Sequence, residues 1–271
     1  MKQLKFLFTL VLSAIVAIFV TTACTPSNTG GTAATDDATR TLTMATSADY
    51  PPYEFIDSSS GSQEIVGFDI DIAKAITERL GYGLTIDNID FNGLIPALQS
   101  NRADFVMAGM TPTEERKQNV DFSTIYFEAQ NTIVARQGSG LTTAESLNGK
   151  TVGVQLGSIQ EGAAREIEGI NLKSLNRINE IVQELKSGRI EAAIVEDTVA
   201  QGYIEANPDL EFNVIPNDGE SGSAIAFPKG SELLAEFDPI LQEMIENGTI
   251  EQLAQKWFSQ EAPEAAASPA S

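Results

Sequence analysis

The sequence predicts an α/β protein built from two similar lobes. Strand-like runs alternate with amphipathic helical segments along the chain, a pattern typical of α/β folds. A weak internal repeat points the same way, because the unit at 98–107 (LQSNRADFVM) recurs at 185–194 (LKSGRIEAAI). In both copies a helix end, a Ser and Arg turn, an acidic residue and an apolar strand follow in the same order. Apolar residues with helical spacing between 233 and 258 indicate that the end of the chain returns to the first lobe.

The first residues are predicted to be an export signal. Lys2 and Lys5 precede an apolar run of about fifteen residues, which is shorter than the about twenty that a membrane-spanning helix needs. The tetrapeptide TTAC, ending at Cys24, resembles the lipobox of bacterial lipoproteins, although Thr21 stands where that pattern prefers Leu. We expect residues 1–23 to be a signal peptide and Cys24 to be lipidated. A plain signal peptide with cleavage nearby is the alternative.

Composition excludes several classes of function. The chain has 271 residues, one cysteine, no histidine and a formal net charge of −21. A Ser-His-Asp triad and a histidine-ligated zinc site are therefore excluded, and no metal or cofactor is expected. The strong negative charge argues against nucleic acid as a partner. It is compatible with a cationic solute, although net charge is weak evidence for one.

The folded part begins after a Ser/Thr/Gly/Ala-rich tether at 24–39 and ends before a tail at 261–271 that we expect to be disordered. Residues 41–45 (TLTMA) are predicted to form a strand. Residues 68–80 are predicted to form a helix with one apolar face. The runs VGV (152–154) and AAIV (192–195) are typical of buried parallel strands.

The stretch AGMTPTEER, ending at Arg116, predicts a helix start that attracts an anion. Thr111 is a suitable N-cap, Pro112 suits the first helical position, and Glu114 and Glu115 suit the first turn. Free N–H groups at a helix start attract negative charge, and an arginine one turn later can pair with a carboxylate. The alternative is that Arg116 pairs with neighbouring surface acids.

Seven motifs together carry a family resemblance that extends over about residues 41–258. They occur in this order: Tyr50–Tyr53 (YPPY), Gly67–Ala73 (GFDIDIA), Asp90–Leu98 (DFNGLIPAL), Ala108–Arg116 (AGMTPTEER), Asp121–Ser123 (DFS), Gly149–Val154 (GKTVGV) and Phe227–Gly230 (FPKG). With them the chain resembles the polar-amino-acid family (family 3) of extracellular solute-binding proteins, the receptors of ABC importers.

The resemblance implies a two-lobed, type II periplasmic-binding-protein-like fold. Two crossing strands would form the hinge, near 129–131 and 221–224, and the ligand would be trapped between the lobes. Lobe 1 would comprise 40–129 plus 223–260, and lobe 2 would comprise 130–222.

The resemblance also implies binding residues in the first lobe. Arg116 matches the arginine that binds the ligand α-carboxylate, and Tyr50 and Phe91 match the aromatic residues that enclose the ligand side chain. Gly109 and Thr111 match positions that bind the backbone end of the ligand, Gly109 through its carbonyl. The first-lobe set is completed by Met110 and Ser47. Ser47 departs from several relatives, which have an acid there, so a basic-specific pocket does not follow from the motifs alone.

In the second lobe, Gln155, Ser158 and Ile159 fall on the loop after the predicted first strand of that lobe, at another helix start. Glu196 stands where the family usually has the aspartate that binds the ligand α-ammonium. Its side chain is longer by one methylene, and Asp197 could take that role through a one-residue slip.

The sequence therefore predicts a receptor rather than an enzyme. It would be lipid-anchored, extracytoplasmic and monomeric, and it would deliver a polar or basic L-amino acid to the membrane permease of an ABC importer. The alternative is a cyclohexadienyl-dehydratase-like enzyme on the same fold, with Glu196 or Asp197 as a general acid or base.

Overall fold

The structure is a computed structural model that describes these residues: 40–59, 61–216, 219 and 221–258. The predicted signal peptide, the lipidation site Cys24, the tether and the C-terminal tail lie outside the described residues. Within the described part, no helix combines the length and apolar character that crossing a bilayer requires.

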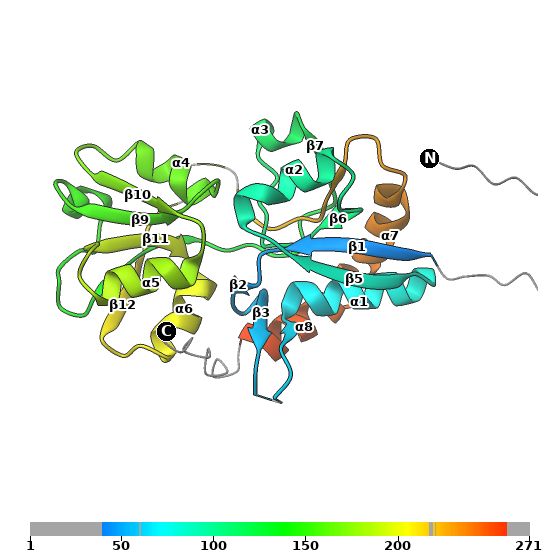
Figure 1. Ribbon diagram of the computed structural model, residues 1–271, viewed down its shortest axis with the longest axis horizontal. Coiled ribbons are helices and arrows are strands. Elements are labelled where there is room, and N and C mark those ends of the chain that lie inside the picture. Colours follow the sequence, from blue (N-terminus) through cyan, green and yellow to red (C-terminus); the bar gives the residue numbers. More distant parts are fainter. Residues whose placement is uncertain (1–39, 60, 217–218, 220, 259–271) are drawn as a thin grey trace, which may run out of the picture. The chain divides into compact units, whose positions relative to one another are not determined.

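The first sheet has five strands in the order β5-β1-β6-β13-β7, and we call the part built on it the first lobe (Figure 1). β1 pairs in parallel with β5 and β6, whereas β13 is antiparallel to β6 and β7. The strands are β1 (Thr41–Thr46), β5 (Gly83–Asn88), β6 (Phe105–Val106), β7 (Val120–Phe122) and β13 (Ala226–Pro228). The predicted strand at 41–45 is thus confirmed.

Helices cover both faces of the first sheet. They are α1 (Phe68–Leu80), η1 (Phe91–Gly93), α2 (Leu94–Gln99), α3 (Glu114–Lys117), α7 (Leu233–Glu246) and α8 (Thr249–Phe258). Leu42 and Met44 of β1 are fully buried in a core that includes apolar residues of α1 and α7, whereas Ala45 packs with Leu94 and Leu98 of α2. The predicted helix at 68–80 and the return of the chain to this lobe are confirmed.

The second sheet, order β10-β9-β11-β8-β12, builds what we call the second lobe. Its strands are β8 (Asn131–Arg136), β9 (Thr151–Gln155), β10 (Asn171–Leu175), β11 (Ala192–Glu196) and β12 (Leu210–Val214). Its helices are η2 (Ala144–Leu147), α4 (Ile159–Arg165), α5 (Ile178–Lys186) and α6 (Asp197–Glu205). As in the first lobe, the second strand in the order, here β9, is parallel to both its neighbours, and the fourth strand, here β8, pairs antiparallel with the third. β8 precedes β9 in the chain, so the prediction that the run at 152–154 is the first strand of this lobe is wrong. The runs at 152–154 and 192–195 are buried parallel strands, as predicted.

The sequence repeat corresponds to a structural repeat. After α2 and after α5, the chain turns through a residue with positive φ, Asn101 (53°) in one copy and Gly188 (73°) in the other. The N–H of the next residue, Arg102 or Arg189, donates to the carbonyl five residues back, at 2.9 and 3.0 Å respectively. This six-to-one bond closes the end of a helix in the same way in both lobes.

The acid of the repeat binds the turn to the second strand in the order of each sheet, β1 in the first and β9 in the second. The Asp104 carboxylate accepts from the N–H of Thr43 at 2.7 Å, and the Glu191 carboxylate accepts from the N–H of Thr151 at 3.0 Å. The acid is therefore a backbone acceptor in both copies, which gives a physical reason for its place in the repeat.

Two connecting segments join the lobes and run side by side. Phe127, between β7 and β8, forms an antiparallel bridge with Ser223, between β12 and β13. The N–H of Ser223 donates to the Phe127 carbonyl at 2.7 Å. Ser223 lies within the predicted second crossing at 221–224. Phe127 lies two residues before the predicted first crossing at 129–131.

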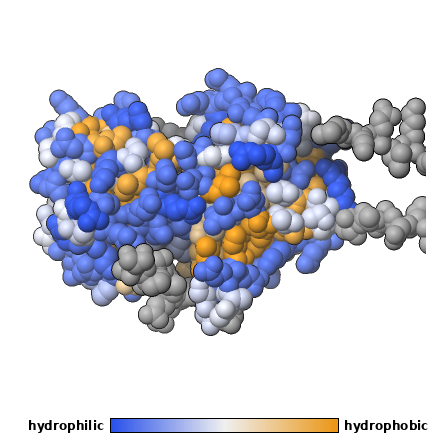
Figure 2. All heavy atoms as spheres, viewed as in Figure 1, coloured by the Kyte–Doolittle hydropathy of each residue, from blue (hydrophilic) through white to orange (hydrophobic). Residues whose placement is uncertain are grey.

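A small three-stranded sheet lies beside the first lobe. It consists of β2 (Asp49–Tyr50), β3 (Glu54–Asp57) and β4 (Glu64–Val66). β2, which contains Tyr50, lies at the edge of the first lobe that faces the second lobe (Figure 1). On the face shown in Figure 2, hydrophilic residues dominate and apolar residues gather in a few patches.

Candidate functional site

One pocket between the lobes collects nine of the eleven predicted binding residues. Its lining residues are Tyr50, Phe91, Ala108, Gly109, Thr111, Arg116, Gln155, Ser158, Ile159, Gln160 and Glu196. Ser47 and Met110 are also buried but do not belong to this lining. Residues up to Arg116 come from the first lobe and the others come from the second. The pocket is therefore formed by both lobes.

The first-lobe wall of the pocket is aromatic. Tyr50 and Phe91 are both buried. Gly109 has a φ of 54°, and a Cβ atom there would lie 3.0 Å from Cε1 of Tyr50. A side chain at position 109 would therefore strain the backbone and crowd the ring. The Gly109 N–H donates to the Asp69 carboxylate at 3.0 Å, which fixes this close approach.

The predicted N-cap at Thr111 is wrong. The helix α3 begins at Glu114, and Thr113 caps it by accepting from the Arg116 N–H at 3.2 Å. Thr111 and Pro112 are outside the helix, and the Thr111 carbonyl instead accepts from the Arg116 side chain. With only four residues, α3 offers little dipole to an anion. Any attraction for a carboxylate here depends on the arginine itself.

Arg116 is held in the pocket by two carbonyl groups rather than by surface acids. Its Nη1 donates to Thr111 O at 2.8 Å, and its Nη2 donates to Gly157 O of the second lobe at 2.9 Å. The guanidinium carbon lies 5.3 Å from the centre of the Phe91 ring, a cation–π arrangement. Burial lowers the pKa of Arg116 to about 10, so the side chain remains cationic at neutral pH. Three of its five N–H groups are not used in these two bonds and can donate to a carboxylate.

The second-lobe wall consists of the end of β9 and the start of α4. Gln155 is buried and is the last residue of β9. Its predicted place on the loop after this strand is therefore wrong, because Gln155 still belongs to the strand. Ser158 caps α4, accepting from the Glu161 N–H at 3.1 Å and donating to the Gln155 carbonyl at 2.8 Å. Ile159 is the first residue of the helix, as predicted.

Glu196 places a carboxylate at the end of β11. It is 8% exposed, and the Thr198 hydroxyl donates to its Oε1 at 2.8 Å. Burial raises the pKa of Glu196 to about 7, and the hydroxyls of Tyr53 and Thr198 oppose that increase. A cation bound beside Glu196 would favour its ionised form.

Asp197 has a different environment from its neighbour. Its Oδ1 accepts from the backbone N–H groups of Gln130 at 3.1 Å and of Thr198 at 2.9 Å. It is absent from the pocket lining given above. The geometry therefore favours Glu196 over Asp197 as the acid of the site.

Two lining residues were not predicted, Ala108 and Gln160. Gln160 follows Ile159 in the first turn of α4, and its Nε2 donates to Asn131 Oδ1 at 2.9 Å. The amide thus connects the pocket wall to the first residue of β8, which follows one of the two connecting segments. A helix-start signal could have included Gln160, but the direction of its side chain depends on β8.

The space left within the pocket is small, about 10 Å³. This is at the lower limit for a single water molecule. An amino acid therefore enters only when side chains or lobes move, and it would displace contacts such as the Arg116–Gly157 bond.

A larger groove of about 260 Å³ lies between the lobes near β3, α6 and α8. Its lining is rich in apolar residues, including Pro51, Pro52, Phe55, Trp257 and Phe258. No arginine or lysine is among its described lining residues, so it has no partner for a carboxylate. In the described parts of the chain, no group of His, Cys, Asp and Glu side chains is arranged to hold a metal ion.

Known proteins match this chain over most of its length. The model for bacterial extracellular solute-binding proteins, family 3, matches residues 42–260. The arginine-binding extracellular protein ArtP of Bacillus subtilis (strain 168) is 47% identical over 257 residues, which cover 93% of this chain and 98% of the relative.

Solved structures match equally well. The crystal structure of the substrate binding protein of an amino acid ABC transporter is similar with a TM-score of 0.79 and 44% identity, over 81% of this chain and 100% of the other. An ancestral arginine-binding protein bound to arginine has a TM-score of 0.76 and 43% identity, over 80% of this chain and 98% of the other. An ancestral arginine-binding protein bound to glutamine also has a TM-score of 0.76 and 43% identity, over 81% of this chain and 98% of the other. The predicted two-lobed α/β fold is confirmed.

Proposed function

The chain belongs to the bacterial extracellular solute-binding proteins, family 3, and we propose that its ligand is a basic L-amino acid, with L-arginine the first candidate. The predicted class of function, amino-acid binding outside the cytoplasm for an ABC transporter, is confirmed at the level of the family. The compared proteins are binding proteins and not enzymes, so the dehydratase alternative is set aside.

One observation carries the assignment of an amino acid to this pocket, the presence of Arg116 and Glu196 from different lobes in a single lining. The guanidinium of Arg116 matches the α-carboxylate of an amino acid, and the Glu196 carboxylate matches its α-ammonium. Each charge comes from a different lobe, so only the two lobes together bind both ends. Ligand binding then favours the state in which the lobes are in contact.

The preference for a basic side chain is supported by the aromatic wall. The flat faces of Tyr50 and Phe91 offer apolar contact to an aliphatic stem and a cation–π contact to a guanidinium. Ser47 is uncharged and lies outside the pocket lining, so the aromatic residues carry more of the recognition. Glutamine, bound by one structural relative, is the main competitor.

A thermal-shift screen against the twenty L-amino acids and ornithine, followed by calorimetry, tests the ligand. A ligand that binds only the native state raises the melting temperature as its concentration exceeds Kd. We expect the largest increase with arginine, then lysine and ornithine. A larger increase with glutamine than with arginine would contradict the basic preference, and no increase with any amino acid would contradict the site.

We further propose lobe limits of 40–129 plus 223–260 and of 130–222, with closure about the Phe127–Ser223 bridge. The protein would act as a monomer, anchored by lipid at Cys24, beside its permease. Replacement Cys24→Ala should release the protein from the membrane fraction into the surrounding fluid. Retention of that variant in the membrane fraction would contradict the anchor.

A further inference from the structure

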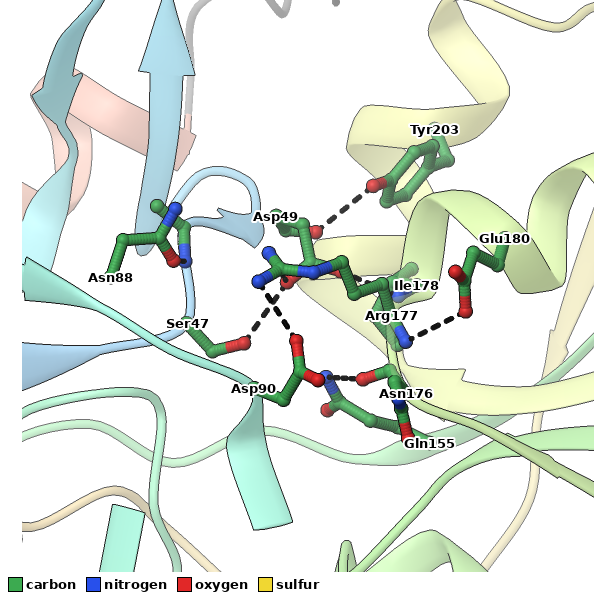
Figure 3. Close-up of polar contacts among 11 residues, drawn as sticks. Ser47, Asp49, Asn88, Asp90, Gln155, Asn176, Arg177, Ile178, Glu180 and Tyr203 are labelled. Atoms are coloured by element: carbon green, nitrogen blue, oxygen red, sulfur yellow. Dashed lines mark hydrogen bonds and ion pairs between the residues drawn. The ribbon is translucent and has the colours of Figure 1, made fainter. Parts of the chain in front are cut away.

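A cluster of polar contacts crosses between the lobes at the start of α5 (Figure 3). Asp49 of β2 accepts from the N–H of Ile178, the first residue of α5, at 2.5 Å. The preceding residue, Arg177, pairs with Asp90 of the first lobe, Nη2 to Oδ1 at 2.8 Å. The Tyr203 hydroxyl of α6 donates to the Asp49 carbonyl at 2.9 Å. The second lobe therefore contacts both the side chain and the backbone of Asp49.

These acids are next in sequence to the aromatic residues of the pocket. Asp49 directly precedes Tyr50, and Asp90 directly precedes Phe91. When α5 holds the two acids, it also fixes the backbone that carries the two rings. Gln155, which lines the pocket from the second lobe, donates through Nε2 to the carbonyl of Asn176 at 3.4 Å (Figure 3). Asn176 is the residue before Arg177, so the pocket lining also contacts the start of α5.

We propose that Asp49, Asp90 and Arg177 form a cross-lobe latch that positions Tyr50 and Phe91 and slows ligand release without touching the ligand. The idea of ligand release rests on the proposed function, whereas the contact between lobes does not. None of the three residues lines the pocket, so all three are positioning residues.

Burial decides which part of the latch matters most. The Asp49 side chain is 6% exposed, whereas those of Arg177 and Asp90 are 29% and 39% exposed. Ion pairs that solvent reaches contribute little to stability. A buried N–H left without an acceptor is costly, and water satisfies it only when the lobes separate. The Ile178–Asp49 bond is therefore the main element of the latch.

The hydrogen-bond acceptor matters more than the charge of Asp49. Burial raises the pKa of the Asp49 carboxyl, and the Ile178 N–H, the Ser47 hydroxyl and Arg177 oppose this only in part. The Ser47 hydroxyl donates to Oδ1 at 3.0 Å. A neutral side chain with an oxygen in the same place should thus retain most of the latch.

The first test measures the dissociation rate of L-arginine by stopped flow. In Asp49→Ala we expect the rate to rise about tenfold, the effect of leaving one buried donor unsatisfied. Asp49→Asn, which keeps an acceptor oxygen, should rise much less. Asp87→Ala, at an exposed acid of β5, is the matched control and should match the parent. In Asp49→Asn the ratio of arginine to glutamine affinity should not change, because the retained acceptor keeps the two rings in place.

The second test needs no ligand, so it remains decisive if arginine is the wrong ligand. Spin labels at Glu78→Cys on α1 and Thr142→Cys in the second lobe, in a protein carrying Cys24→Ala, report the distance between lobes. Asp49→Ala should increase the population with separated lobes. If that variant fails to fold, Tyr203→Phe removes one hydroxyl and should give a smaller increase in the same direction.

Two outcomes would overturn the latch. One is an unchanged lobe distance together with an unchanged dissociation rate in Asp49→Ala and Tyr203→Phe. The other is an altered preference between arginine and glutamine in Asp49→Asn, because that would place Asp49 against the ligand. Failure of the proposed function looks different, since arginine would not bind the parent while the lobe distances would still respond.

Discussion

The two ends of the pocket carry opposite charges, and the two charges differ in how firmly they are fixed. Arg116 stays cationic although burial lowers its pKa to about 10. Glu196 has a pKa raised by burial to about 7, so near neutral pH it is only partly ionised. The charge of Arg116 is thus insensitive to physiological pH, whereas the charge of Glu196 is poised to respond to it.

Burial disfavours the charged form of both side chains, but an arginine starts with a pKa far above neutral pH and a glutamate does not. Arg116 donates to two backbone carbonyls, whose dipoles stabilise a cation. Glu196 accepts from the neutral Thr198 hydroxyl, and the nearby acids Asp197 and Asp69 raise its pKa further. A bound ammonium would supply the compensating charge that Glu196 lacks.

The largest expected effect is that of Arg116→Ala. Truncating one partner of a buried charge pair costs about 2–5 kcal/mol, or very roughly thirty- to several-thousand-fold in affinity. The fold should persist, because Arg116 lies on the four-residue helix α3. Calorimetry measures the affinity and thermal denaturation measures the stability of the fold. Lys117→Ala, on the same helix, is the control. An affinity within twofold of the parent would disprove the carboxylate role of Arg116.

Glu196→Gln should have the next largest effect. At pH 8 we expect affinity to fall about ten- to a hundredfold, the range for a hydrogen bond to a charged group. The ligand-free variant should melt at a higher temperature at pH 8, because the parent then holds an ionised carboxylate whose folded-state pKa exceeds its unfolded value. Calorimetry and thermal melts at pH 8 test both signs. Lower stability of the variant would show that Glu196 is better solvated than its burial indicates.

The pH dependence of the parent separates the two ends directly. Below the pKa of about 7, ligand binding must release the proton on Glu196, so affinity should fall about tenfold per pH unit as pH decreases. Above pH 8 this loss on acidification should be absent, and Glu196→Gln should not show it at any pH. Calorimetry in buffers of different ionisation enthalpy measures the released proton. A flat profile for the parent from pH 5 to 8 would mean that Glu196 does not bind the amine.

The smallest expected effect is that of Asp197→Asn, which should raise ligand affinity where the other two substitutions lower it. Asp197 raises the pKa of Glu196, so removing its charge should leave Glu196 more fully ionised at pH 7. Affinity should increase by at most about twofold, since about half of Glu196 is ionised already. The amide keeps the oxygen that accepts from the Gln130 N–H. A large loss of affinity would instead assign the amine contact to Asp197.

Much of the fold was predictable because its signals are local. In the helix at 68–80, apolar residues recur once per turn, and the predicted bounds match those of α1. The repeat at 98–107 and 185–194 was visible because a left-handed turn and a backbone-binding acid need particular residue types at fixed spacing. Most of the candidate site came from the family resemblance, which carries spatial information that periodicity lacks.

The errors have physical causes too. Thr111 and Thr113 both suit an N-cap in sequence, and only the path of the chain decides which hydroxyl faces the Arg116 N–H. Gln160 was missed because the direction of its side chain on α4 depends on a hydrogen bond to Asn131, the first residue of β8.

The sequence by itself determined the α/β class, the repeat, the order of the motifs and the charged types available for an amino acid, because each depends on neighbours within a few residues. The tertiary structure alone decided the pKa of Glu196 and the contact between Asp49 and Ile178, which are 129 residues apart. Desolvation and a hydrogen bond between lobes arise only when distant segments meet and exclude water, and no local pattern encodes that meeting.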